Sequence, residues 1–116
     1  MHELPITQSI LSIVLRHAAG QNVTKIVRIR LRVGELSDLA DEWIQHYFSY
    51  LSRGTLAQDA TLAITRAPIV LRCAACNGSF EMAKDRLSEA RCSTCGGERL
   101  ELVAGRGYFI EDMEVR

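Results

Sequence analysis

Four cysteines are the residues of this 116-residue chain whose types and spacing most clearly indicate chemistry. They form two Cys-x-x-Cys pairs, Cys73 with Cys76 and Cys92 with Cys95, and the sequence contains no other cysteine. Each pair can direct two sulfur atoms toward one point, and the fifteen residues between the pairs allow these points to coincide. Four thiolates complete a tetrahedron around zinc. The spacing therefore predicts a structural zinc site with no open position at which water could be activated.

Other uses of the four cysteines are chemically possible. Two disulfides would require an oxidising compartment, and the first residues lack the pattern of a secretory signal. A redox-active pair of the thioredoxin type would leave the second pair without a role. Iron in a rubredoxin-like site uses the same four ligands, so the spacing alone does not separate iron from zinc. We expect zinc because sulfur ligands suit it well.

The amino terminus offers a second group of potential ligands. The amine of Met1, the backbone nitrogen of His2 and the imidazole of His2 can close adjoining chelate rings around one ion, with the nitrogens nearly in a plane. Such planar nitrogen coordination suits Ni(II) or Cu(II). The backbone nitrogen of Glu3 or a partner's group could be the fourth ligand, and carboxylates such as Glu3, Asp38 or Asp41 could support the site. A histidine that is merely solvated is the commoner case, so these residues alone do not decide whether the amino terminus binds a metal.

Composition and charge narrow the class of protein. The chain has 14 Lys and Arg residues against 14 Asp and Glu residues, and a nucleic-acid binder normally shows a basic excess. No apolar run approaches the roughly 20 residues that cross a membrane. We therefore expect a soluble, cytoplasmic protein that binds neither nucleic acid nor a membrane. The sequence contains neither a phosphate-binding loop nor a nucleophile elbow, so we expect no enzyme.

Hydrophobic periodicity predicts two helices that would position these ligands. Apolar residues at steps of three and four predict a first helix, with Pro5 in its first turn and Gly20 after its end. A second helix is expected between Asp38, a plausible N-cap, and Gly54. Its apolar side, which we expect in the core, consists of Trp43, Ile44, Tyr47, Phe48 and Leu51.

Alternating residues predict three strands that form one sheet. Residues 25–33 and 61–67 alternate clearly, and the three arginines within 25–33 fall on one face, which we expect to be solvated. The last strand, 108–115, places Phe109, Met113 and Val115 on a shared face and suggests a bulge near residue 111 or 112.

These elements predict an α+β fold, in which a small three-stranded sheet is backed by two helices and carries an inserted, zinc-ribbon-like lobe with four cysteine ligands. The expected α/β domain consists of residues 1–68 and 106–116, and the expected zinc-binding lobe consists of residues 69–105. A lobe of this size could not fold without its metal.

Three motifs in this order and at this chain length resemble the HypA/HybF family of accessory proteins for nickel incorporation into [NiFe] hydrogenase. They are the opening Met1-His2-Glu3, the Val33-Gly34-Glu35 turn after an alternating strand, and the cysteine quartet. The resemblance covers the whole chain.

The resemblance implies a nickel metallochaperone with an α/β domain and a zinc lobe. It implies that His2 is the main Ni(II) ligand, beside the Met1 amine and the backbone of Glu3. It also implies partners: a nickel-inserting GTPase, the hydrogenase large subunit and, for some members, urease accessory proteins. Some members have a further histidine in or near the zinc lobe. Here the histidines are only His2, His17 and His46, so that ligand is absent.

Two other classes of protein fit parts of the sequence. A zinc-ribbon module that binds proteins or nucleic acids would use the quartet but would show a basic face and salt-dependent binding. A redox or iron protein would be coloured and would not contain zinc. Cu(II) is a chemical competitor at the terminal site, because the order of metal affinities favours it over Ni(II).

Overall fold

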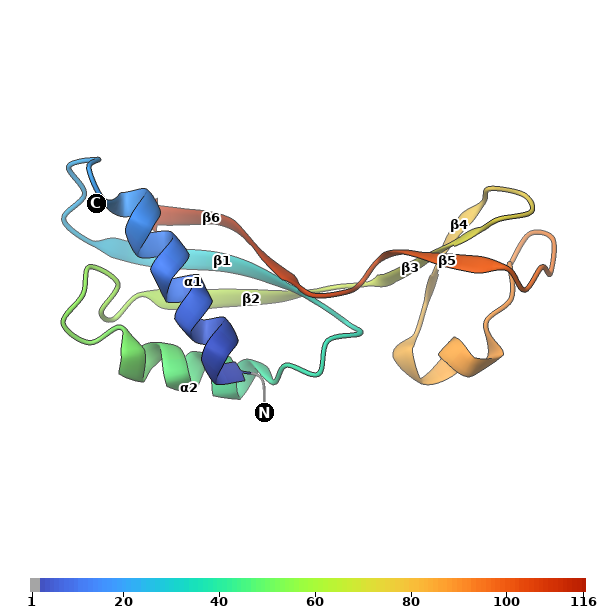
Figure 1. Cartoon of the computed structure of the whole chain (residues 1–116), viewed down its shortest axis with the longest axis horizontal. Coiled ribbons are helices and arrows are strands. Elements are labelled where there is room, and N and C mark those ends of the chain that lie inside the picture. Colours follow the sequence, from blue (N-terminus) through green and yellow to red (C-terminus); the bar gives the residue numbers. More distant parts are fainter. Residues whose placement is uncertain (1–2) are drawn as a thin grey trace. The chain divides into compact units, whose positions relative to one another are not determined.

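The computed structural model describes residues 3–116, which divide into two compact units (Figure 1). Unit 1 comprises the described part of Met1–Arg32, together with Asp38–Thr65 and Phe109–Arg116, and unit 2 comprises Val33–Ser37 and Arg66–Tyr108. The elements, in chain order, are α1 (Glu3–Ala18), β1 (Ile26–Gly34), α2 (Asp41–Leu51), β2 (Thr61–Ala67), β3 (Ile69–Cys73), β4 (Ser79–Met82), the 3-10 helix η1 (Lys84–Glu89), β5 (Leu100–Ala104) and β6 (Tyr108–Val115).

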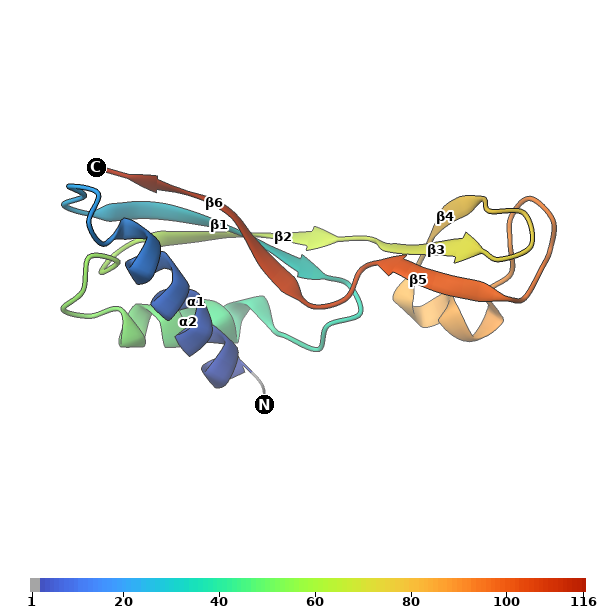
Figure 2. The ribbon, with the colours of Figure 1, turned by 45° about the horizontal axis from the view of Figure 1, so that its top comes forward.

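Unit 1 is a three-stranded sheet covered by two helices. The strand order is β2-β1-β6, so the last strand of the chain pairs with the first. Figures 1 and 2 show α1 and α2 on the same side of this sheet. The predicted three-stranded sheet backed by two helices is confirmed.

The core of unit 1 lies between this sheet and the two helices. Helix α1 buries Ile10 and Val14, and α2 buries Ile44 and Phe48, each pair at a spacing of four residues that keeps both side chains on one helix face. Strand β1 contributes Ile26 and the alternating residues Ile29 and Leu31, all of which are fully buried. The exposed arginines of β1 fall on the opposite face, as expected for a sheet covered on one side.

The prediction that Trp43 and Tyr47 lie in the core together with Ile44 and Phe48 was wrong. Trp43 is 49% exposed, and Tyr47 is half-buried. Ile44 and Phe48 alone fill the inward face, so the neighbouring rings extend to the boundary with solvent. Spacing identified the helix correctly but did not fix its rotation about its own axis.

The predicted N-cap of α2 was also wrong. The capping position is Ala40, whose side chain cannot accept a hydrogen bond, and Asp38 lies two residues before it. The Ala40 N–H donates instead to Oε2 of Glu3, at 3.0 Å. The carboxylate of Glu3 therefore accepts from the N–H of the capping residue, as the glutamate of a capping box does within a single helix.

Strand β6 does not present the apolar face that the sequence predicted. Phe109 is 53% exposed, whereas Tyr108, Ile110 and Met113 are half-buried. The half-buried positions change from even to odd numbers between Ile110 and Met113, the region in which we expected a bulge. On the open face, Arg30 of β1 is 2.7 Å from Asp112.

Unit 2 contains a second three-stranded sheet, with the order β4-β3-β5. Both neighbours of β3 are antiparallel to it, and Ile69, Leu71 and Cys73 of β3 are buried. Residues 33–37, which the sequence assigned to the first domain, make backbone hydrogen bonds within this unit. The N–H groups of Gly34, Glu35 and Leu36 donate to the carbonyl oxygens of Gly107, Ala67 and Gly105, respectively, at 2.8, 2.9 and 2.9 Å.

Candidate metal centre

The structure brings the four cysteine sulfurs of unit 2 together. All four Sγ atoms lie within 4.8 Å of one another, with 3.6 Å between Cys73 and Cys95 and 3.4 Å between Cys76 and Cys92. All four are free thiols, at separations well beyond a disulfide bond. Zn–S bonds of about 2.3 Å in a tetrahedron would place the sulfurs about 3.8 Å apart. The quartet therefore has the dimensions of a tetrahedral metal site.

Both cysteine pairs lie in turns with the same backbone hydrogen bonds. In the first turn the N–H of Cys73 donates to the Gly78 carbonyl, and the Cys73 carbonyl accepts from the N–H of Asn77. In the second turn Cys92 makes the corresponding bonds with Gly97 and Gly96. The fourth residue after the leading cysteine has positive φ in both, at 62° for Asn77 and 73° for Gly96. Asparagine and glycine adopt this conformation more readily than other residues.

Glycines follow both pairs at positions where a side chain would touch sulfur. A Cβ at Gly97 would lie 3.3 Å from the sulfurs of Cys73 and Cys95, and a Cβ at Gly78 would lie 3.4 Å from the sulfur of Cys76. Larger residues would therefore press on the sulfurs.

Backbone N–H groups stabilise the thiolates of the two leading cysteines. The N–H groups of Cys95 and Thr94 approach the sulfur of Cys92, at 3.5 and 3.4 Å, and lower the pKa of Cys92 to about 6. The N–H groups of Cys76 and Ala75 lower the pKa of the Cys73 thiol in the same way. Both leading cysteines are buried, so these N–H groups replace the lost solvation of the anion.

The trailing cysteines behave in the opposite way. For Cys95 the N–H of Gly97 lowers the pKa, but the adjacent sulfurs of Cys73, Cys92 and Cys76 outweigh it and raise the pKa to about 12. For Cys76 the N–H of Gly78 is outweighed by the sulfur of Cys92 and by burial, so the pKa is also raised. Four adjacent thiolates repel one another, and a bound cation is what would relieve this repulsion. The donor set therefore fits a divalent, sulfur-binding metal.

The predicted ligands at the amino terminus are only partly described. Met1 and His2 lie outside the described residues, whereas Glu3 is the first residue of α1. The Glu3 carbonyl oxygen accepts a hydrogen bond from Oγ1 of Thr7 at 2.5 Å, and its carboxylate accepts from Ala40. Asp41 is the first residue of α2, directly after Ala40. The sequence gave no indication that Glu3 would contact the start of α2.

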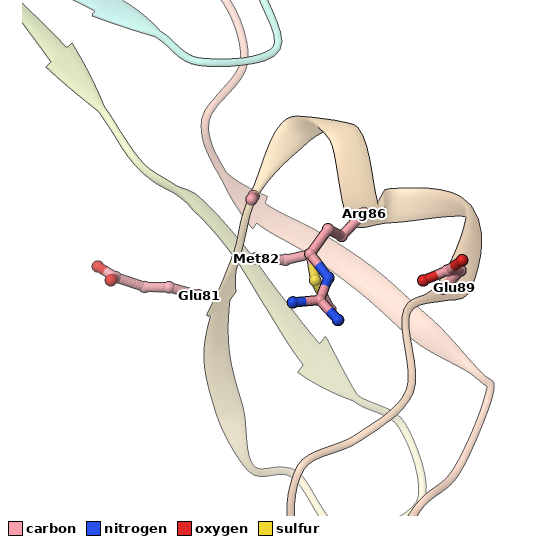
Figure 3. Close-up of a pocket in the computed structure, with 5 residues that line it drawn as sticks. Glu81, Met82, Arg86 and Glu89 are labelled. Atoms are coloured by element: carbon pink, nitrogen blue, oxygen red, sulfur yellow. The ribbon is translucent and has the colours of Figure 1, made fainter.

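The two other histidines and the pockets add no second metal site among residues 3–116. His17, in the last turn of α1, and His46, on α2, are both exposed. The cysteine quartet is the only group of three or more potential ligands found in the described part of the chain. A pocket of about 370 Å³ in unit 2 is lined mainly by residues of β4 and η1 (Figure 3). Glu81 points away from Met82 and Arg86 there, so its charged groups do not converge.

None of the helices in the described part of the chain is long and apolar enough to cross a membrane. This agrees with the absence of a long apolar run in the sequence. The helices that the structure does contain are amphipathic, with buried residues on one face only.

Comparison with known proteins identifies the family. The family model described as hydrogenase/urease nickel incorporation, metallochaperone, hypA matches residues 1–115. The hydrogenase maturation factor HypA of Geobacter sp. (strain M21) is 38% identical over 115 residues, which cover 99% of both chains. That of Dehalococcoides mccartyi is 35% identical over 115 residues, covering 99% of this chain and 94% of that protein.

The fold agrees with that of a solved structure. The solution structure of the Ni metallochaperone HypA from Helicobacter pylori matches with a TM-score of 0.71 at 23% identity, over 99% of this chain and 97% of that one. At this identity the structural match shows the fold alone. The family is shown by the family model and by the relatives of similar sequence. The resemblance inferred from the three motifs is thereby confirmed, and the chain belongs to the HypA family of hydrogenase/urease nickel-incorporation metallochaperones.

Proposed function

We propose that this protein carries Ni(II) at its amino terminus and helps to insert it into the large subunit of [NiFe] hydrogenase. The observation that carries the proposal is that the match to the family model begins at residue 1 and so includes Met1, His2 and Glu3. The amine of Met1, the imidazole of His2 and the backbone of Glu3 would bind nickel as cargo. No catalytic step is part of this function.

The position of Glu3 supports a metal site at this end of the chain. Two hydrogen bonds fix Glu3, one from Thr7 to its carbonyl oxygen and one from Ala40 to its carboxylate. A ligand segment that begins beside a fixed residue loses less conformational freedom when it binds a metal. The same carboxylate gives the site a negative charge near a divalent cation.

Release of nickel requires a weak and accessible site. A terminal chelate with an incomplete ligand set can pass its ion by exchange of ligands with a partner, whereas a closed site would retain it. We infer that a nickel-inserting GTPase and the hydrogenase large subunit are the partners, with urease accessory proteins as a second class. Nickel transfer to these partners would take place in the cytoplasm.

We further infer that the cysteine quartet holds Zn(II) in a structural role. Four sulfur ligands leave no open position, and the spacing of the sulfurs in the structure suits the ion. Bound zinc would keep all four thiols deprotonated and would join the two cysteine turns. Metal analysis should give one zinc per chain in a colourless protein, whereas a visible absorption band from iron would contradict this assignment.

The nickel site can be tested by titration with Ni(II) while the absorption spectrum is recorded. We expect one ion per chain and a band typical of square-planar nitrogen coordination. His2→Ala should abolish this binding, and so should two residues added before Met1, because the added residues remove the amine from the chelate. Binding should also weaken below about pH 6, because only the neutral imidazole coordinates nickel.

His17→Ala and His46→Ala are the matched controls, since both residues are exposed histidines on helices. They should leave nickel affinity unchanged. Unchanged affinity in His2→Ala and in the extended chain would overturn the assignment of the site.

A further inference from the structure

The first cysteine turn contains a pair of residues that is chemically labile. Asn77 is followed directly by Gly78, and the sequence contains no other Asn-Gly pair. Where glycine follows asparagine, the glycine nitrogen can attack the side-chain amide with little hindrance, because glycine has no side chain to block the approach. Asn77 is exposed and Gly78 is half-buried, so water has access to this pair.

The geometry of the metal site itself favours these two residues. Position 77 has a φ of 62°, a conformation that asparagine and glycine adopt more readily than other residues. Position 78 lies beside the sulfur of Cys76, since a Cβ there would be 3.4 Å away. The second cysteine turn has the corresponding constraints and meets them with Gly96 and Gly97. Only the first turn therefore combines this backbone with a side-chain amide.

Hydrogen bonds hold both residues in the closed turn. The N–H of Asn77 donates to the carbonyl oxygen of Cys73 at 2.8 Å. The N–H of Gly78 donates to the sulfur of Cys76, and its carbonyl oxygen accepts from the N–H of Cys73 at 2.9 Å. Attack on the side chain of Asn77 would turn the Gly78 nitrogen into an imide nitrogen, which carries no hydrogen. The reaction must therefore break the hydrogen bond to the Cys76 sulfur.

We propose that Asn77 and Gly78 form a self-modification site that the metal keeps closed: the pair deamidates when the cysteine quartet is empty, and the product prevents the quartet from taking up metal again. The inference rests on the proposed zinc in the quartet and is independent of nickel at the amino terminus. Bound zinc ties the Cys76 sulfur to the three others and so fixes the acceptor of the Gly78 N–H. Without a metal nothing joins the two cysteine turns, and the first turn can open.

The reaction needs water and no other reagent. The Gly78 nitrogen bonds to the side-chain carbonyl carbon of Asn77, and the side-chain amide nitrogen leaves as ammonia with the proton of the Gly78 N–H. Water then opens the cyclic imide at either of its carbonyl carbons. Opening at the side-chain carbonyl gives aspartate at position 77. Opening at the main-chain carbonyl gives isoaspartate, in which the backbone runs through the former side chain.

Both products disturb the metal site. Isoaspartate inserts one additional carbon atom into the backbone before Gly78, which displaces the N–H that faces the Cys76 sulfur and the carbonyl oxygen that faces the Cys73 N–H. Aspartate keeps the backbone but adds a negative charge beside four thiolates. Isoaspartate should therefore prevent the quartet from closing around a metal, and aspartate should weaken metal binding.

Mass spectrometry of the full chain tests the reaction. The zinc-bound chain and the chain freed of zinc by a chelator are incubated at neutral pH with a reductant, and isoaspartate is detected by labelling with an isoaspartyl methyltransferase. Modification of Asn77 should be about tenfold or more faster in the metal-free chain, because the reaction proceeds from a locally opened form. Equal rates in the two samples, or an unmodified Asn77 in the metal-free chain, would overturn the proposal.

Asn22, the only other asparagine of the chain, is an internal control. It is exposed and has a φ of 53°, close to that of Asn77, but the next residue is the β-branched Val23. Asn22 should stay unmodified in both samples. Modification of Asn22 as fast as that of Asn77 in the metal-free chain would contradict a specific site in the cysteine turn.

The block to metal uptake is tested by returning zinc to samples taken during the incubation. In the wild type, zinc uptake should fall as isoaspartate accumulates. Asn77→Gly has no side-chain amide and carries the residue found at Gly96 in the second turn, so it should keep the uptake that it has at the start. The reductant prevents disulfides, which would also lower uptake. Equal losses in both chains would reject the block.

The proposed zinc and the proposed reaction can fail independently in this experiment. Zinc content at the start reports the metal assignment by itself, whereas the change in uptake with time reports the reaction. Nickel binding at the amino terminus is not part of either measurement.

Discussion

At Gly34 the backbone of one chain segment lies very close to the backbone of another, which is possible because glycine has no side chain. A Cβ on Gly34 would lie 2.1 Å from the carbonyl oxygen of Gly105 and 2.7 Å from the nitrogen of Arg106. These are backbone atoms, which cannot rotate away as a flexible side chain can. The glycine of the Val33-Gly34-Glu35 motif therefore has a physical reason. Any side chain at this position would collide with the backbone of Gly105 and Arg106.

Gly34→Ala should consequently destabilise the protein by roughly 3 kcal/mol, because the added methyl group overpacks a contact between backbones. Gly54→Ala is the control, since Gly54 has a φ of 77° but nothing within 4 Å of a Cβ. Its cost should be about 1 kcal/mol, from the left-handed backbone alone. Urea unfolding of both variants measures the difference. Equal losses would show that the close approach has no energetic consequence.

At the scale of elements, the sequence predicted which segments are helices and strands better than it predicted how they face. The apolar period of two residues in β1 and of three to four residues in α1 was sufficient to predict the sheet and the helices that cover it. The rotation of α2 about its axis was predicted wrongly, because Trp43 and Phe48 are both large aromatic residues and packing decides which one is buried. The cysteine cluster could be predicted from spacing, whereas the contact of Glu3 with Ala40 depends on tertiary structure.

That contact joins the first residue of α1 to the start of α2, and it can be tested by stability. Glu3→Ala should lower the free energy of unfolding by about 1 kcal/mol, because the first turn of α2 loses an acceptor and a negative charge near its positive end. Glu42→Ala, which removes an exposed acid from the same turn, should cost about 0.5 kcal/mol or less. Both variants should be unfolded with urea in the absence of nickel. A smaller loss for Glu3→Ala than for Glu42→Ala would contradict a capping role.

At the scale of the whole molecule, the chain is organised as one unit interrupted by another. Strands β2 and β6 belong to the same sheet, yet the segment between them, which includes β3, β4 and β5, forms most of unit 2. Unit 2 buries few apolar side chains, mainly Val33, Ile69 and Leu71, besides the cysteines. Units of this size usually depend on a metal or on disulfides. Unit 1 has the larger buried core and should not share this dependence.

Removal of the metal by a chelator should therefore unfold unit 2 and leave unit 1 folded. The segment between β2 and β6 would then become a flexible loop, whose closure costs little more than that of a shorter loop. Hydrogen exchange followed along the chain distinguishes the two units. We expect loss of protection in β3, β4 and β5 and retained protection in α1, α2 and β1. Unchanged protection in β3 after complete metal removal would contradict a structural role for the quartet.

The hydrogen bonds of residues 33–37 have a consequence for any attempt to isolate the metal-binding part of the protein. A fragment cut at 66 and 108 would lack the N–H groups that reach the carbonyl oxygens of Ala67, Gly105 and Gly107. The missing part is a five-residue segment, 33–37, that is separate in sequence from the rest of unit 2. An isolated metal-binding fragment would need this segment, either joined by a short linker in a permuted chain or added as a separate peptide.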